Sequence, residues 1–133
     1  MNAMMNTDDT RIREIKELLP PIAHLYELPI SEMASSTVHN ARSEVADIIH
    51  QNDKRLAVIV GPCSIHDPKA ALEYADRLRP LIDQYKNELL IIMRVYFEKP
   101  RTTVGWKGLI NDPHLNGTHD INAGLRLARR LLL

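Results

Sequence analysis

Short apolar runs and a helical stripe alternate in the second half of the chain. Two apolar runs, at 56–60 and 89–96, predict strands, and the first, a continuous run rich in β-branched residues, is expected to be covered on both faces. Between them, Asp67 and Pro68 form a helix start, a capping acid followed by proline at the first helical position. Pro80 should kink or interrupt that helix. This order predicts one βαβ unit with parallel strands and a right-handed crossover.

The first half of the chain is predicted to be helical. Asp8 and Asp9 precede apolar residues at helical spacing, and we expect a helix of only about two turns that ends at Pro20 and needs a docking surface. Residues 22–30 lie between prolines and are expected to be irregular or extended. Residues 31–50 carry a longer apolar stripe, which is typical of a helix with one packed face.

The end of the chain begins a second βα unit. Residues 97–117 show neither period, and loops this long inside a domain are usually functional. Thr118 or Asp120 can then cap a last helix. Because two parallel strands cannot close a barrel, the predicted fold is the start of a larger α/β domain. We divide the chain into an N-terminal extension, 1–54, and an α/β part, 55–133.

Composition and charge limit the classes of function. The 133 residues include 17 basic and 17 acidic side chains, so no global field favours nucleic acid or an anionic membrane. No apolar run approaches the ~20 residues of a membrane span, and the polar start is no signal peptide. We therefore expect a cytoplasmic protein without nucleic-acid or membrane partners. The last apolar stripe runs to Leu133 without a C-cap signal, and we expect a truncated chain.

Candidate chemistry gathers in the two loops that follow the predicted strands. Ligands of parallel α/β proteins bind beyond the carboxyl ends of the strands, which places Cys63 on the same side as Arg94 and Lys99. Cys63, the single cysteine, can be a nucleophile or a soft metal ligand, or an inert small hydrophobe. The Cys-x-x-His spacing to His66 is weak evidence for zinc, and a histidine hydrogen-bonded near a helix start is at least as good an interpretation.

Basic residues around the second loop suggest a local anion site. Arg94, Lys99 and Arg101 could bind two anionic groups together with the hydroxyl groups that follow them. An internal salt-bridge network with Glu98 or Asp112 explains the same composition nearly as well. Further along the loop, the tryptophan at position 106 could be a packing anchor or a subunit contact.

Two stretches are specific enough to resemble a known family. They are Gly61-Pro-Cys-Ser-Ile-His-Asp67 and the run from Met93 to Pro113, and they resemble the microbial type (class I) of 3-deoxy-D-arabino-heptulosonate-7-phosphate (DAHP) synthase. Residues 8–21 look like the N-terminal extension of the same family. A (β/α)₈ barrel needs about 250 residues. The resemblance therefore implies that residues 55–133 are the first part of a catalytic barrel that is incomplete in this chain.

The resemblance implies an activity and a set of site residues. The family condenses phosphoenolpyruvate with erythrose 4-phosphate, using a divalent metal such as Mn, Fe or Co. By motif, Cys63 matches a metal ligand, and Arg94 and Lys99 match catalytic residues that bind phosphoenolpyruvate, with Lys99 also near the aldehyde. The segment that binds erythrose 4-phosphate corresponds to Lys99, Pro100, Arg101 and Thr102.

The resemblance also leaves parts of the enzyme unaccounted for. The remaining metal ligands of the family, a histidine and two carboxylates, come from later strands, so we expect the isolated chain to be inactive. Asp8, Asp9 and Ile12 match an arm that contributes to subunit contacts in a homodimer or homotetramer and to feedback inhibition by an aromatic amino acid. Two alternatives remain: a related phosphoenolpyruvate-dependent sugar-acid synthase that uses another aldose phosphate, and a non-catalytic interaction or regulatory module.

Overall fold

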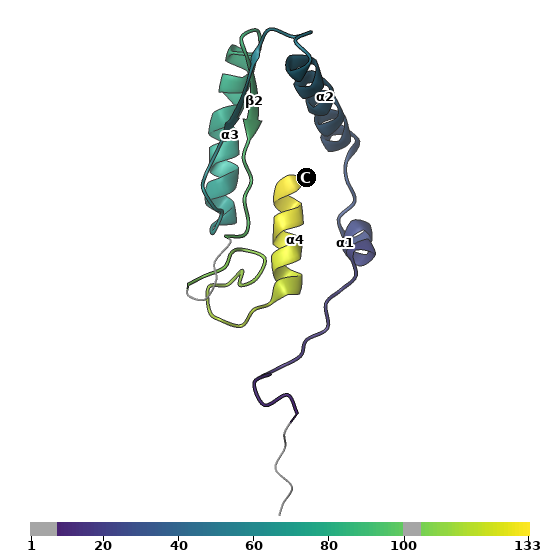
Figure 1. Ribbon diagram of the computed structural model, residues 1–133, viewed down its shortest axis with the longest axis vertical. Coiled ribbons are helices and arrows are strands. Elements are labelled where there is room, and N and C mark those ends of the chain that lie inside the picture. Colours follow the sequence, from purple (N-terminus) through teal and green to yellow (C-terminus); the bar gives the residue numbers. More distant parts are fainter. Residues whose placement is uncertain (1–7, 100–104) are drawn as a thin grey trace, which may run out of the picture.

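The computed structural model describes residues 8–99 and 105–133 and has a mixed α/β architecture (Figure 1). Its elements are α1 (Pro21–Glu27), α2 (Glu32–Ile49), β1 (Leu56–Val60), α3 (Pro68–Gln84), β2 (Leu89–Met93) and α4 (Ile121–Leu132). Helix α3 lies along the strands, and α4 lies between this βαβ unit and the two N-terminal helices. The predicted α/β class is confirmed. No helix of the described residues is long and apolar enough to cross a membrane.

The two strands form a parallel pair, as predicted. Their register runs from Leu56 opposite Leu89 to Val60 opposite Met93. β1 has the predicted bounds, but β2 ends three residues earlier than expected. Beyond β2 the Arg94 N–H still bonds Val60, the last residue of β1, and the Tyr96 carbonyl oxygen bonds Ile65 in the loop that follows β1.

Helix α3 begins where the sequence predicts it and is not interrupted at Pro80. The Asp67 side chain accepts a hydrogen bond from the Lys69 N–H at 2.8 Å, and Pro68 occupies the first turn. The predicted interruption at Pro80 is wrong, because one helix runs through it to Gln84. A proline removes one backbone hydrogen bond. Here Pro80 is exposed, and the helix is held by its buried face.

The N-terminal segment differs from its prediction. The residues expected to form the first helix, 11–19, have no regular structure, and α1 begins at Pro21 inside the stretch expected to be irregular. Proline is well suited to the first helical position, so the Pro20-Pro21 pair starts a helix instead of ending one. In contrast, α2 begins as predicted, with the Ser31 hydroxyl accepting from the Ala34 N–H at 3.1 Å.

The apolar core lies at the carboxyl ends of the strands. Ile65, Ala71 and the fully buried Leu109 form its centre, which joins the loop after β1, helix α3 and the loop after β2. β1 itself is less covered than predicted. Leu56 and Ile59 of β1 are 65% and 68% exposed, since only α2 and α3 pack on the sheet to any extent among the described elements.

Candidate functional site

The loops after the two strands are tied together directly beyond the sheet. The Arg94 N–H donates to the Val60 carbonyl oxygen at 2.6 Å, and the Ile65 N–H donates to the Tyr96 carbonyl oxygen at 2.8 Å. Cys63 lies between these two attachment points on the first loop and is exposed to solvent. The thiol and Arg94 therefore belong to the same end of the sheet, as the strand order predicts.

Gly61 allows this close approach. Its φ angle is +149°, and a Cβ atom there would lie 2.6 Å from the Arg94 carbonyl oxygen. Only glycine adopts such a conformation readily and leaves room for another backbone. The first residue of the predicted motif is therefore a packing requirement at the site.

Arg94 is exposed and stacks on an aromatic ring. Its guanidinium carbon lies 4.9 Å from the centroid of the Tyr96 ring, within the range of a cation–π interaction. The side chain is therefore not buried in the interior of the described chain. Among the described residues, Arg94 makes no ion pair.

The two carboxylates that could neutralise the cations have other partners. Glu98 accepts from the backbone N–H groups of Ile110 and Asn111 at 3.0 and 3.2 Å, and from the Asn111 side-chain amide. Asp112 is buried and accepts from the Gly117 N–H. Within the described part of the chain, neither pairs with Arg94 or Lys99, so the predicted salt-bridge alternative is wrong for these residues.

The second loop folds back and holds Lys99 at its base. The Lys99 N–H donates to the Lys107 carbonyl oxygen at 2.8 Å, beside a bridge between Glu98 and Gly108. Trp106 donates to the Asp112 carbonyl oxygen at 2.8 Å and packs against the core. Its predicted role as a packing anchor is confirmed. Lys99 is half-buried and has no ion pair among the described residues, whereas Lys107 is exposed.

Several predicted site residues lie outside the described part of the chain. They are Pro100, Arg101 and Thr102. Of the predicted effector arm, Asp8, Asp9 and Ile12 are described and exposed, and Ile12 lines an open pocket of about 780 Å³ between the arm and the loop before α4. Their roles stay predictions.

A metal centre is not assembled by the described residues. No group of three histidine, cysteine, aspartate or glutamate side chains gathers there in a way that could hold an ion. Divalent metals in proteins usually take four or more ligands. Cys63 supplies at most one of them, so even together with the exposed His66 it does not complete a metal site among these residues.

The docking of the N-terminal segment on α4 was not predicted in this form. Asn122 accepts from the Leu19 N–H at 3.0 Å and donates to the Glu17 carbonyl oxygen at 3.1 Å. Arg126 bonds both oxygens of the Glu27 carboxylate at 2.8 Å, and Arg129 donates to the Leu28 carbonyl oxygen. The hydrogen bond from Arg126 lowers the pKa of Glu27, and burial opposes it. The sequence signals for this contact are the short N-terminal segment that needs a docking surface and the arginines on one side of the last helix.

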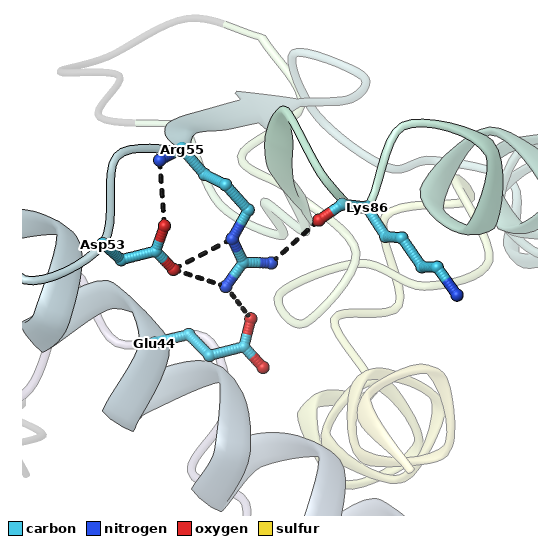
Figure 2. A network of polar contacts seen from close by, with 4 residues as sticks. All are labelled: Glu44, Asp53, Arg55 and Lys86. Atoms are coloured by element: carbon cyan, nitrogen blue, oxygen red, sulfur yellow. Dashed lines mark hydrogen bonds and ion pairs between the residues drawn. The ribbon is translucent and has the colours of Figure 1, made fainter.

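A charged network closes the opposite, amino-terminal end of the sheet (Figure 2). Arg55, just before β1, bonds Asp53 at 2.7 and 2.9 Å and Glu44 of α2 at 2.6 Å, and its third nitrogen reaches the Lys86 carbonyl oxygen at 3.2 Å. Hydrogen bonds from the Arg55 side chain and backbone lower the pKa of Asp53, and bonds to Asp53 and Glu44 raise the pKa of Arg55. This network joins α2, β1 and the turn before β2.

A parallel βαβ unit with its basic residues beyond the carboxyl ends of the strands is the arrangement in which α/β proteins bind ligands. Residues 27–129 match the DAHP synthetase I family, and the chain belongs to this family. The resemblance expected from the two motifs is confirmed.

Individual relatives agree with this assignment. The chain is 63% identical over 125 residues to the phospho-2-dehydro-3-deoxyheptonate aldolase of Haemophilus influenzae, covering 94% of this chain and 34% of that protein. It is 63% identical over 126 residues to the Phe-sensitive enzyme of Escherichia coli, covering 95% and 36%. The structure of the Francisella tularensis enzyme matches with a TM-score of 0.86 at 54% identity, over 90% of this chain and 35% of that one. The chain thus spans about a third of the length of these relatives.

Proposed function

We propose that this chain forms the first part of the (β/α)₈ barrel of a DAHP synthase, which condenses phosphoenolpyruvate with erythrose 4-phosphate. The observation that carries the proposal is the pair of cations, Arg94 and Lys99, at the carboxyl ends of the strands without a carboxylate partner among the described residues. Unpaired cations held there are suited to phosphate and carboxylate groups. The exposed faces of Leu56 and Ile59 are suited to further βα units.

In this proposal the chain provides charge, position and one metal ligand. Arg94 and Lys99 bind phosphoenolpyruvate, and Lys99 also lies near the aldehyde of the second substrate. The erythrose 4-phosphate segment comprises Lys99, Pro100, Arg101 and Thr102. Preorganised cations lower the barrier by neutralising charge without reorganisation at the moment of reaction. Cys63 contributes one thiolate to a Mn, Fe or Co ion whose other ligands lie outside the described residues, and such an ion polarises a carbonyl oxygen.

Regulation and assembly belong to the same proposal. Relatives are named Phe-sensitive and Trp-sensitive, which supports an aromatic amino acid as effector, with Asp8, Asp9 and Ile12 in the arm that contributes to its site. The complete enzyme would be a homodimer or homotetramer in the cytoplasm. The names of the relatives favour the four-carbon aldose phosphate over another sugar phosphate, and no observation favours a non-catalytic module.

A chimera tests the catalytic role. Residues 1–133 replace the matched third of the Phe-sensitive E. coli relative, and condensation is measured with both substrates. We expect turnover by the chimera, and a loss of about 10²- to 10³-fold in kcat for Lys99→Met, the magnitude of removing one preorganised electrostatic group. Lys107→Met is the matched control, because Lys107 is exposed in the same loop, and it should stay within about twofold.

The outcomes separate the parts of the proposal. A folded chimera in which Lys99→Met retains parental kcat would refute the role of Lys99. An unfolded or inactive parental chimera would refute the claim that this chain can serve as the first part of such a barrel. The isolated 133-residue chain is expected to show no turnover, and measurable synthase activity would contradict its proposed dependence on further βα units.

A further inference from the structure

Arg94 has an unusual environment for an arginine at the end of an apolar strand. Its guanidinium is exposed, has no ion pair among the described residues, and lies 4.9 Å from the centre of the Tyr96 ring. A free arginine side chain loses rotamer entropy when it is fixed on a ligand. Anything that already restricts the guanidinium therefore reduces the free-energy cost of binding.

Tyr96 is itself well anchored. Val95 and Phe97 pack against the core, so in this extended segment the alternate residues Arg94 and Tyr96 share the opposite side. The Tyr96 carbonyl oxygen accepts the Ile65 N–H at 2.8 Å, and the backbone of Arg94 is bonded to Val60. Both members of the stack are thus fixed by their backbones and by the core behind them.

A ring restrains the cation in a way that a carboxylate could not. A carboxylate would occupy the N–H donors of the guanidinium and cancel its charge, whereas the face of a ring leaves the donors at the edge available. Glu98 is next to this segment in sequence, but its oxygens are taken by Ile110 and Asn111. The environment keeps Arg94 charged, restrained and open to an anion.

We propose that Tyr96 is a positioning residue, which holds the Arg94 guanidinium by stacking so that its donors meet a phosphate or carboxylate group of the substrate. This inference rests on the proposed function, because that function supplies the anion, phosphoenolpyruvate. It assigns to Tyr96 a role through Arg94 and no direct contact with the reacting atoms.

The test uses the full chain with ¹⁵N-labelled arginine and follows the Nε–H signal of Arg94 by NMR during titration with phosphoenolpyruvate. In the unmodified chain and in Tyr96→Phe, the ring current should move the chemical shift of this signal away from that of a free arginine side chain. Both proteins should bind phosphoenolpyruvate with similar affinity. In Tyr96→Leu the displacement should disappear and the affinity should fall about two- to fivefold, as expected from the loss of one exposed cation–π contact. Tyr85→Leu, at the end of α3, is the matched control and should change neither quantity.

Each outcome decides a different claim. If Tyr96→Leu binds as tightly as the unmodified chain, or if Tyr96→Phe is as weak as Tyr96→Leu, the positioning role of the ring is overturned. If the Arg94 signal of the unmodified chain shows the ring displacement but does not respond to phosphoenolpyruvate, the proposed function fails for this residue, and the positioning role fails with it. Tyr96→Phe guards against a loss of folding, since it preserves the ring that packs in this segment.

Discussion

Each end of the small sheet carries an arginine, and the two arginines differ in their partners. At the amino-terminal end, Arg55 is surrounded by Asp53, Glu44 and a backbone carbonyl oxygen (Figure 2). At the carboxyl end, the Arg94 guanidinium stacks on the Tyr96 ring and makes no ion pair among the described residues, and the Glu98 carboxylate is bonded elsewhere. An arginine whose donors are taken by carboxylates holds elements of the fold together, whereas an arginine without a carboxylate partner keeps its donors available for a ligand.

Replacing each arginine by methionine is expected to have the largest effects. Arg94→Met in the chimera should lower kcat/KM about 10²- to 10³-fold, because a preorganised cation is lost, while the urea midpoint of unfolding stays nearly unchanged. Arg55→Met should do the reverse, lowering the midpoint because Asp53 and Glu44 lose their shared partner. Steady-state kinetics and urea unfolding on both variants check this, and similar profiles would contradict the division of roles.

The approach of the two strand ends can be broken at Gly61. Gly61→Ala should destabilise the chain by about 3 kcal/mol, combining a positive φ with overlap on the Arg94 carbonyl oxygen. Gly117→Ala is the matched control, since its φ is +72° but nothing lies within 4 Å of the added Cβ, and about 1 kcal/mol is expected. Urea unfolding measures both. Equal losses in the free energy of unfolding for the two variants would mean that the close approach to Arg94 adds no cost to the Gly61 substitution.

His24 is a buried polar side chain without a hydrogen-bond partner among the described residues, and unlike the exposed Arg94 it should lower the stability of the fold. His24 of α1 is 7% exposed, and neither ring nitrogen has a hydrogen-bond partner among the described residues. Such a group carries a desolvation cost, so His24→Leu should raise the free energy of unfolding by about 1 kcal/mol. Thermal unfolding at pH 8 checks this, with exposed His39→Leu as control. A clear loss of stability in His24→Leu would point to a partner or role for the imidazole.

The smallest expected effect is the pH dependence of the Arg55 network, because its groups are partly exposed and screened by solvent. The folded state lowers the pKa of Asp53 below its usual 3.8. The ionised Asp53 carboxylate therefore contributes its full stabilisation above pH 3.8, the usual pKa that it has in the unfolded chain. This stabilisation is lost as the pH falls through the lower pKa of the folded state. Asp53→Asn should reduce the fall of the urea midpoint in acid, compared with Asp83→Asn on exposed α3. Identical acid profiles would exclude this linkage.

Local signals in the sequence predicted much of the site's framework. The bounds of β1, the Asp67 cap and the parallel βαβ unit are confirmed, and of the two proposed caps for the last helix Asp120 is the one used. These features depend on residues within a few positions of one another, which is why pattern and capping rules find them. The same topology predicted that the Cys63 loop and Arg94 share one end of the sheet.

The partners of individual side chains could not be read from the sequence. Glu98 was a candidate partner for the cations, but Ile110 and Asn111 take its oxygens once the loop folds back. The stacking of Arg94 on Tyr96 needed the extended backbone beyond β2 to be known. Both depend on the path of a loop that shows neither helical nor strand periodicity.

The sequence by itself determined the order of the elements, their caps and the family, because these are written in short motifs and local periods. The tertiary structure alone decided the N-terminal segment. Its helical spacing predicted a helix, but Asn122, about a hundred residues away, bonds the backbone at Glu17 and Leu19. Two turns of helix are too weak to compete with such long-range partners, so packing overrides the local preference.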